Sequence, residues 1–120
     1  MEMNRIWNSR NLHQGNWKKV LCVCSAGLLR SPTLARVLSM PPYNYNTRSA
    51  GLEKSYALIP VDKVLLAWAD EVFCMNEFQR EKLMEMTETP VFSLEITDSY
   101  SYMDPDLIET IEEKLKKHYA

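Results

Sequence analysis

The stretch VLCVCSAGLLRSPT, residues 20 to 33, runs from an apolar segment into a pattern that starts a helix. The segment from Lys19 to Val23 is short, mostly apolar and partly β-branched, which predicts a buried strand. Ser31 followed by Pro32 is typical of a helix start, with serine as the N-cap and proline at the first helical position. We therefore expect a strand, then Cys24 in a short loop, then a helix.

The rest of the chain repeats this alternation. Short apolar runs predict three further strands, at 45–49, 71–75 and 90–95. Apolar residues at helical spacing predict helices that begin near Pro60, at Asn76 as N-cap, and at the pair Asp104-Pro105. The order β-α-β-α-β-α-β-α favours an α/β fold with a parallel sheet and helices on both faces.

The bulk properties narrow the class of protein. We expect a polar arm at 1–17 and one α/β domain at 18–120. A formal net charge of −2 argues against nucleic acid or an anionic membrane as a partner, since both attract a basic excess. No apolar run approaches the roughly 20 residues of a membrane span. Three cysteines without a secretory signal predict a cytoplasmic protein, not a disulfide framework.

The loop between the first predicted strand and helix can bind an anion. The first turn of a helix has unpaired N–H donors, and its dipole adds about half a positive charge. If residues 25–30 curl round, their amides converge on one point, and Gly27 helps because it can adopt a positive φ. Arg30 adds a planar, two-pronged donor for phosphate oxygens. Ligands of parallel sheets also bind at this end of the strands.

Cys24 would then lie beneath the bound anion. The loop should stabilise its thiolate, which could attack phosphorus in line and give a cysteinyl-phosphate that water hydrolyses. The alternative is an inert packing cysteine, because buried cysteines on strands are common. A chance Cys-x5-Arg is expected in roughly one such chain in seven. The preceding strand and the capped helix that follows favour the catalytic interpretation.

The motif CSAGLLRSP at 24–32, with its strand, and the later SAG at 49–51 resemble the low-molecular-weight protein tyrosine phosphatases. The resemblance covers about residues 18 to 118, with gaps. It implies a four-stranded parallel sheet and a protein tyrosine phosphatase without metal or other cofactor. The implied substrate is a phosphorylated protein or a small aryl phosphate, with phosphate or vanadate as ligands. We expect a monomer.

The resemblance also assigns roles to residues. Cys24 would be the nucleophile, Arg30 the phosphate clamp, and Ser31 the group that steadies the leaving thiolate. The family usually has asparagine where Gly27 stands, so a hydrogen-bonding network is expected to be missing. Leu29 replaces a frequent second cysteine, which removes a protective disulfide partner. Leu28 lies where tyrosine phosphatases resembling this chain carry a bulky apolar residue, which favours an aryl phosphate.

Two aspartates compete as general acid. Asp104 precedes Pro105 and an apolar helical stripe, where an N-cap belongs, and a carboxylate bonded to helix amides is a poor proton donor. Asp98 follows the last predicted strand and has an aromatic residue, Tyr100, two positions on, as the family's acid does. We therefore predict Asp98 as the acid. The predicted catalytic residues are Cys24, Arg30 and Asp98, and the predicted phosphate- or substrate-binding residues are Ser25, Ala26, Gly27, Leu28, Leu29, Ser31 and Tyr100.

Two other functions are compatible with the motif. One is arsenate reduction on the same fold, which uses the loop cysteine and a later cysteine pair. Only Cys74 lies downstream here, and both Cys74 and Cys22 are predicted to be packing residues. The other is a phosphate-binding module without catalysis, against which the intact cysteine, arginine and candidate acid argue.

Overall fold

The computed structural model describes residues 18–25, 30–53, 57, 59–97 and 99–120. The predicted arm at 1–17 lies outside this part of the chain. The described strands are β1 (Lys19–Cys24), β2 (Asn46–Gly51), β3 (Glu71–Cys74) and β4 (Val91–Ser93). The described helices are α2 (Arg30–Leu38), α3 (Lys63–Trp68), α4 (Glu77–Met84) and α5 (Pro105–His118).

The four strands form one sheet in the order β2-β1-β3-β4, and every pairing is parallel. The α/β fold with a four-stranded parallel sheet is therefore confirmed. The chain leaves β1 for β2 on one side and then crosses to β3 on the other side. This reversal of strand order makes the carboxyl ends of β1 and β3 the place where ligands of such sheets bind.

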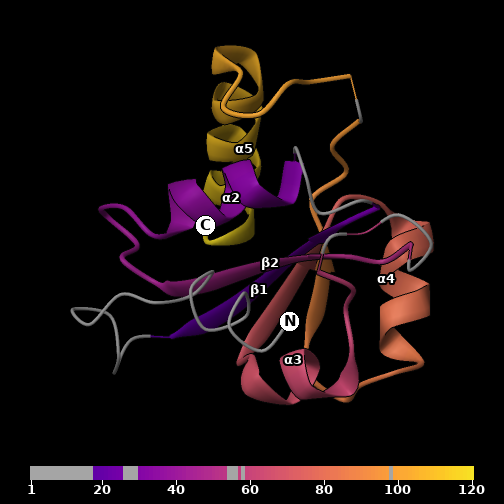
Figure 1. The fold of residues 1–120 in the computed structure, drawn as a ribbon. Helices are drawn as coiled ribbons and strands as arrows, with labels where there is room; N and C mark the ends of the chain where they lie inside the picture. The colour runs from indigo at the N-terminus through magenta and orange to yellow at the C-terminus, as the bar shows by residue number, and fades with distance from the viewer. Residues whose placement is uncertain (1–17, 26–29, 54–56, 58, 98) are drawn as a thin grey trace.

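Helices cover both faces of the sheet (Figure 1). Alternate side chains of β1 point to opposite faces of the sheet, as in any β-strand. Val20 and Cys22 belong to a core shared with α2 and α5, whereas Leu21 and Val23 belong to a core shared with α3 and α4. The first of these cores also contains Cys24, so the sulfur lies on the face that α2 covers.

Two predicted helix caps are confirmed. Asn76 caps α4, and its Oδ1 accepts from the N–H of Gln79 at 2.9 Å. Asp104 caps α5, and its Oδ1 accepts from the N–H of Asp106 at 2.9 Å. In each case a polar residue directly precedes an amphipathic run, so the local sequence contains the whole signal.

Two other predicted helix starts are wrong. The second predicted helix begins at Lys63, with Asp62 as N-cap, and not near Pro60. Helix α2 begins at Arg30, so Ser31 lies within its first turn and is not its N-cap. The Ser31 hydroxyl contacts the Cys24 sulfur, because this position in the first turn of α2 lies against the end of β1.

Not every apolar residue of the two short helices packs inward. Val64 of α3 and Phe78 of α4 are 62% and 60% exposed, whereas Leu65 of α3 and Leu83 of α4 are buried in the core. Among the described residues, no helix is long and apolar enough to cross a membrane.

Candidate active site

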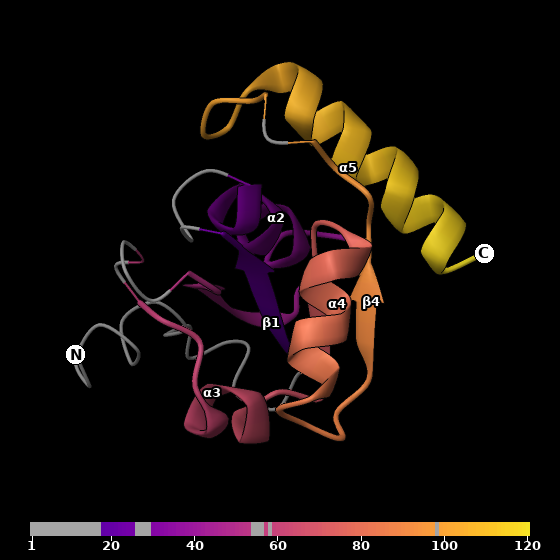
Figure 2. The ribbon, with the colours of Figure 1, turned by 90° about the vertical axis from the view of Figure 1, so that its right-hand side faces the viewer.

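β1 ends at Cys24 and α2 begins at Arg30, and the two elements lie against each other in both views (Figures 1 and 2). Cys24 is the last residue of β1 and is 3% exposed. Its Sγ lies 3.2 Å from the Oγ of Ser31, which is completely buried. Ser31 Oγ is also 3.5 Å from the carbonyl oxygen of Ala50 on β2. The sulfur therefore lies beside a hydroxyl group at the positive end of a helix.

Arg30 is the first residue of α2 and is 7% exposed. Its Nη1 donates to the carbonyl oxygen of Ile96 at 2.7 Å. This bond orients the guanidinium and ties the segment after β4 to the start of α2. A guanidinium has five N–H donors, and the bond to Ile96 uses one of them.

A cavity of about 400 Å³ opens beside Arg30. This volume falls within the usual range for small-molecule sites. The wall combines residues from the ends of β1, β3 and β4 with the first residue of α2. The described residues that line the cavity are Ser25, Arg30, Met75, Asn76, Glu95, Ile96 and Thr97.

The start of the loop is held from both sides. On the β2 side, the N–H of Leu52 donates to the carbonyl oxygen of Cys24, and that of Glu53 donates to the carbonyl oxygen of Ser25, both at 2.9 Å. On the β3 side, Nε2 of Gln79 donates to Ser25 Oγ at 3.2 Å. The residue that follows the cysteine is thus fixed through its main chain and its side chain.

Gln79 is a site residue that was not among those predicted from the sequence. A signal was present, because Asn76-x-x-Gln79 has the spacing of a capping box, in which the side chain of the later residue turns back toward the N-cap. Here the Oε1 of Gln79 accepts from the N–H of Met75 at 2.8 Å, and the nitrogen of the same amide reaches Ser25.

Several predicted site residues fall outside the described residues, namely Ala26, Gly27, Leu28, Leu29 and Asp98. Asp98 follows Thr97, which lines the cavity. Tyr100 is described: it packs against the core, and its hydroxyl lies 3.4 Å from Oγ1 of Thr110. It is not among the residues that line the cavity beside Arg30, so its place in a cleft stays a prediction.

Comparisons with known proteins give matches to solved structures. No family model matches the sequence, and the search of curated proteins gave no match. Wzb of Vibrio vulnificus, solved with benzylphosphonate, has a TM-score of 0.67 and 19% identity, over 86% of this chain and 97% of that chain. The tyrosine phosphatase Wzb of Escherichia coli, solved with sulphate, has a TM-score of 0.66 and 17% identity, over 85% and 96%. The arginine phosphatase YwlE of Geobacillus stearothermophilus has a TM-score of 0.58 and 19% identity, over 84% and 94%.

This chain shares their fold. The low-molecular-weight phosphatase-like architecture expected from the motif is therefore confirmed. At sequence identities below 20%, these matches show a shared fold and no more. The named activities of the neighbours also differ in substrate, one acting on tyrosine and one on arginine.

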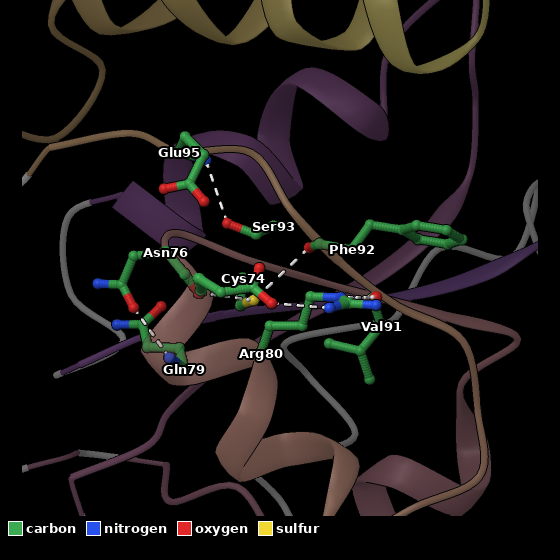
Figure 3. A network of polar contacts seen from close by, with 9 residues as sticks. Cys74, Asn76, Gln79, Arg80, Val91, Phe92, Ser93 and Glu95 are labelled. Carbon is green, nitrogen blue, oxygen red and sulfur yellow. Dashed lines mark hydrogen bonds and ion pairs between the residues drawn. The ribbon is translucent and has the colours of Figure 1, made fainter.

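The other two cysteines have the surroundings of packing residues, as predicted. Cys22 and Cys74 are both completely buried, and none of the three cysteines forms a disulfide. Burial raises the pKa of the Cys22 thiol far above its ordinary value, and it raises that of Cys74 to about 12. Cys74 lies 3.6 Å from the carbonyl oxygen of Phe92 and 3.5 Å from that of Asn76 (Figure 3). Neither thiol therefore has the surroundings of a nucleophile.

A metal centre has no support in the part of the chain that the structure describes. No group of three or more His, Cys, Asp or Glu side chains there could hold a metal ion. The polar groups that the described residues place beside the cavity are an arginine, a serine, an asparagine, a threonine and one glutamate. This set suits an oxyanion better than a cation.

Proposed function

We propose that the protein is a cysteine-dependent phosphomonoester hydrolase that acts on phosphotyrosine in proteins through a cysteinyl-phosphate. The observation that carries the proposal is the position of Cys24 at the carboxyl end of β1. Its sulfur lies 3.2 Å from a hydroxyl in the first turn of α2, and Arg30 begins that helix. Cys22 and Cys74 lack such surroundings, which sets Cys24 apart from a packing cysteine.

The proposed reaction has two displacements. The Cys24 thiolate attacks phosphorus while the ester P–O bond breaks, and Asp98 gives its proton to the leaving oxygen. Water then attacks the cysteinyl-phosphate and gives a proton to the Asp98 carboxylate, the S–P bond breaks, and phosphate is released. Arg30 holds phosphoryl oxygens in both steps. The thiolate that leaves in the second step accepts a hydrogen bond from Ser31 Oγ.

Phosphotyrosine is proposed from two observations. Leu28 is bulky and apolar, as in the tyrosine phosphatases that the motif resembles. Wzb of Vibrio vulnificus, which shares the fold, was solved with benzylphosphonate, a compound whose phenyl ring is one methylene group away from its phosphonate. Both favour an aromatic group beside the phosphoryl group.

Arsenate reduction finds no comparable support. A thiol relay needs a second reactive cysteine downstream of the loop, and Cys74 is the one cysteine there. Its sulfur is completely buried, and its pKa is raised to about 12. At neutral pH this thiol stays protonated and out of reach, so we expect no arsenate turnover with a thiol reductant.

The test is hydrolysis of p-nitrophenyl phosphate and of a phosphotyrosine peptide, with and without orthovanadate. Cys24→Ser should abolish turnover, whereas Cys74→Ala should retain it, because Cys74 lies in the core on the other face of the sheet. Retention of more than a few per cent of activity by Cys24→Ser would overturn the mechanism. Faster hydrolysis of a phosphoarginine peptide would keep the phosphatase assignment but replace its substrate.

A further inference from the structure

The side-chain amide of Gln79 has one possible orientation. The side chain is buried, and one end of its amide lies 2.8 Å from the main-chain nitrogen of Met75. A backbone N–H can only donate, so this end must be the oxygen. The other end is therefore the NH₂ group, which lies 3.2 Å from Ser25 Oγ and donates to it.

The direction of this bond decides what the Ser25 hydroxyl can do. A hydroxyl has one hydrogen and two acceptor lone pairs. Since Gln79 donates to Ser25 Oγ, the hydrogen of Ser25 remains for another acceptor. Ser25 lines the cavity beside Arg30, so this hydrogen is available to a ligand there.

We propose that Gln79 is a positioning residue that makes Ser25 a hydrogen-bond donor to the phosphoryl group of the substrate. The inference rests on the proposed phosphatase function and assigns a chain of donors to it. Met75 N–H donates to Gln79 Oε1, Gln79 Nε2–H donates to Ser25 Oγ, and Ser25 O–H donates to a phosphoryl oxygen. An anionic phosphoryl oxygen accepts without a proton to donate, so it complements this direction.

Asn76, in the same wall of the cavity, has its side-chain amide oriented in the same way. Oδ1 of Asn76 accepts from the N–H of Gln79 at 2.9 Å, so its NH₂ group is the end left for the cavity that Asn76 lines. Figure 3 shows the amides of Asn76 and Gln79 next to each other at the start of α4, with their nitrogen atoms on the same side. Both side chains thus turn their acceptors to the protein and their donors toward the site.

Gln79→Glu is the sharpest test, because it changes the polarity and hardly the shape. A carboxylate can only accept at neutral pH, so it would accept from both Met75 N–H and Ser25 O–H. The packing would remain, but the Ser25 hydrogen would be turned away from the ligand. The variant also adds a negative charge near the site, so the charge effect has to be measured separately.

A double-mutant cycle separates the two effects. Wild type, Gln79→Glu, Ser25→Ala and the double variant would be compared for vanadate inhibition and for kcat/KM on p-nitrophenyl phosphate. One hydrogen bond to a charged group corresponds to roughly a tenfold to hundredfold change in affinity. We expect Ser25→Ala and Gln79→Glu each to weaken vanadate by about tenfold or more. In the Ser25→Ala background, Gln79→Glu should cost less than about threefold.

Each outcome has a defined meaning. Equal effects of Gln79→Glu in both backgrounds would overturn the proposal, because charge or packing would then explain the loss. If Gln79→Glu does not fold, Ser25→Ala alone decides, since a wild-type vanadate affinity in that variant also overturns it. In both cases turnover by the wild type would leave the phosphatase assignment intact. A wild type that neither hydrolyses p-nitrophenyl phosphate nor binds vanadate would overturn both.

Discussion

The two aspartates that compete as general acid can be separated by substitution. Asp104 Oδ1 accepts from the N–H of Asp106 at 2.9 Å at the start of α5. The preceding residue, Met103, donates its N–H to Oγ1 of Thr33 at 2.9 Å, one turn into α2 from Arg30. Asp104 is thus occupied as a helix cap, and it is not among the residues that line the cavity.

Loss of this cap should affect stability and leave catalysis unchanged. Asp104→Ala removes the acceptor and should cost about 1 kcal/mol. For a domain of this size that corresponds to a decrease of about 4 °C in Tm. Asp104→Asn keeps an acceptor that caps equally well, so its Tm should stay within about 1 °C of wild type. Both variants should hydrolyse p-nitrophenyl phosphate at the wild-type rate.

Asp98→Asn should show the opposite behaviour. The segment before it continues β4 along β3, with Ile96 N–H donating to the carbonyl oxygen of Met75 at 2.8 Å. Arg30 also bonds Ile96, and Ile96 and Thr97, just before position 98 in the sequence, line the cavity. We expect about a 10²-fold loss in kcat on phenyl phosphate, whose leaving group needs a proton, and a much smaller loss on p-nitrophenyl phosphate.

The assay is the pH dependence of kcat/KM for both substrates, together with thermal unfolding of each variant. The basic limb of the profile, which reports the proton donor, should disappear in Asp98→Asn and persist in Asp104→Asn. If Asp104→Asn removes that limb and Asp98→Asn keeps it, the assignment of the acid is reversed.

Two further predictions concern the cysteines. Ser31→Ala should slow hydrolysis of the cysteinyl-phosphate by roughly tenfold to hundredfold, because the leaving thiolate loses a hydrogen bond. Rapid-quench kinetics would then show a burst of p-nitrophenol, and unchanged steady-state turnover would exclude this role. Iodoacetate at pH 8 should label Cys24 alone, because the raised pKa values of Cys22 and Cys74 keep both as neutral thiols until the pH is far higher. Mass spectrometry of the peptides checks this labelling pattern, and carboxymethylation of Cys74 in the folded protein would contradict it.

The elements that sequence analysis predicted well are those with local signals. The alternation of strands and helices follows from short apolar runs and helical periodicity. The caps at Asn76 and Asp104 follow from a polar residue directly before an amphipathic segment. Each of these signals involves residues within one or two turns of each other, so one stretch of sequence contains it.

The errors occur where a local preference competes with a distant contact. Ser31 before Pro32 has the pattern of an N-cap, yet its hydroxyl bonds the Cys24 sulfur and lies near Ala50 of β2. A serine at the start of a helix can use its hydroxyl either to cap the helix or to bond a group on a neighbouring strand. The neighbouring strands decide between them, and no local pattern contains those strands.

The loop motif likewise indicates the chemistry of the loop but not the residues that hold the loop in place. Arg30 is held by Ile96, 66 residues away, and Ser25 by Gln79, 54 residues away. Both supporting residues lie just after the carboxyl ends of β4 and β3, which a parallel sheet brings to the same edge as Cys24. A glutamine in an ordinary capping position has no visible link to a loop this far away in sequence. Only the strand order places it beside Ser25, so residues after the other strand ends are where further positioning groups should be sought.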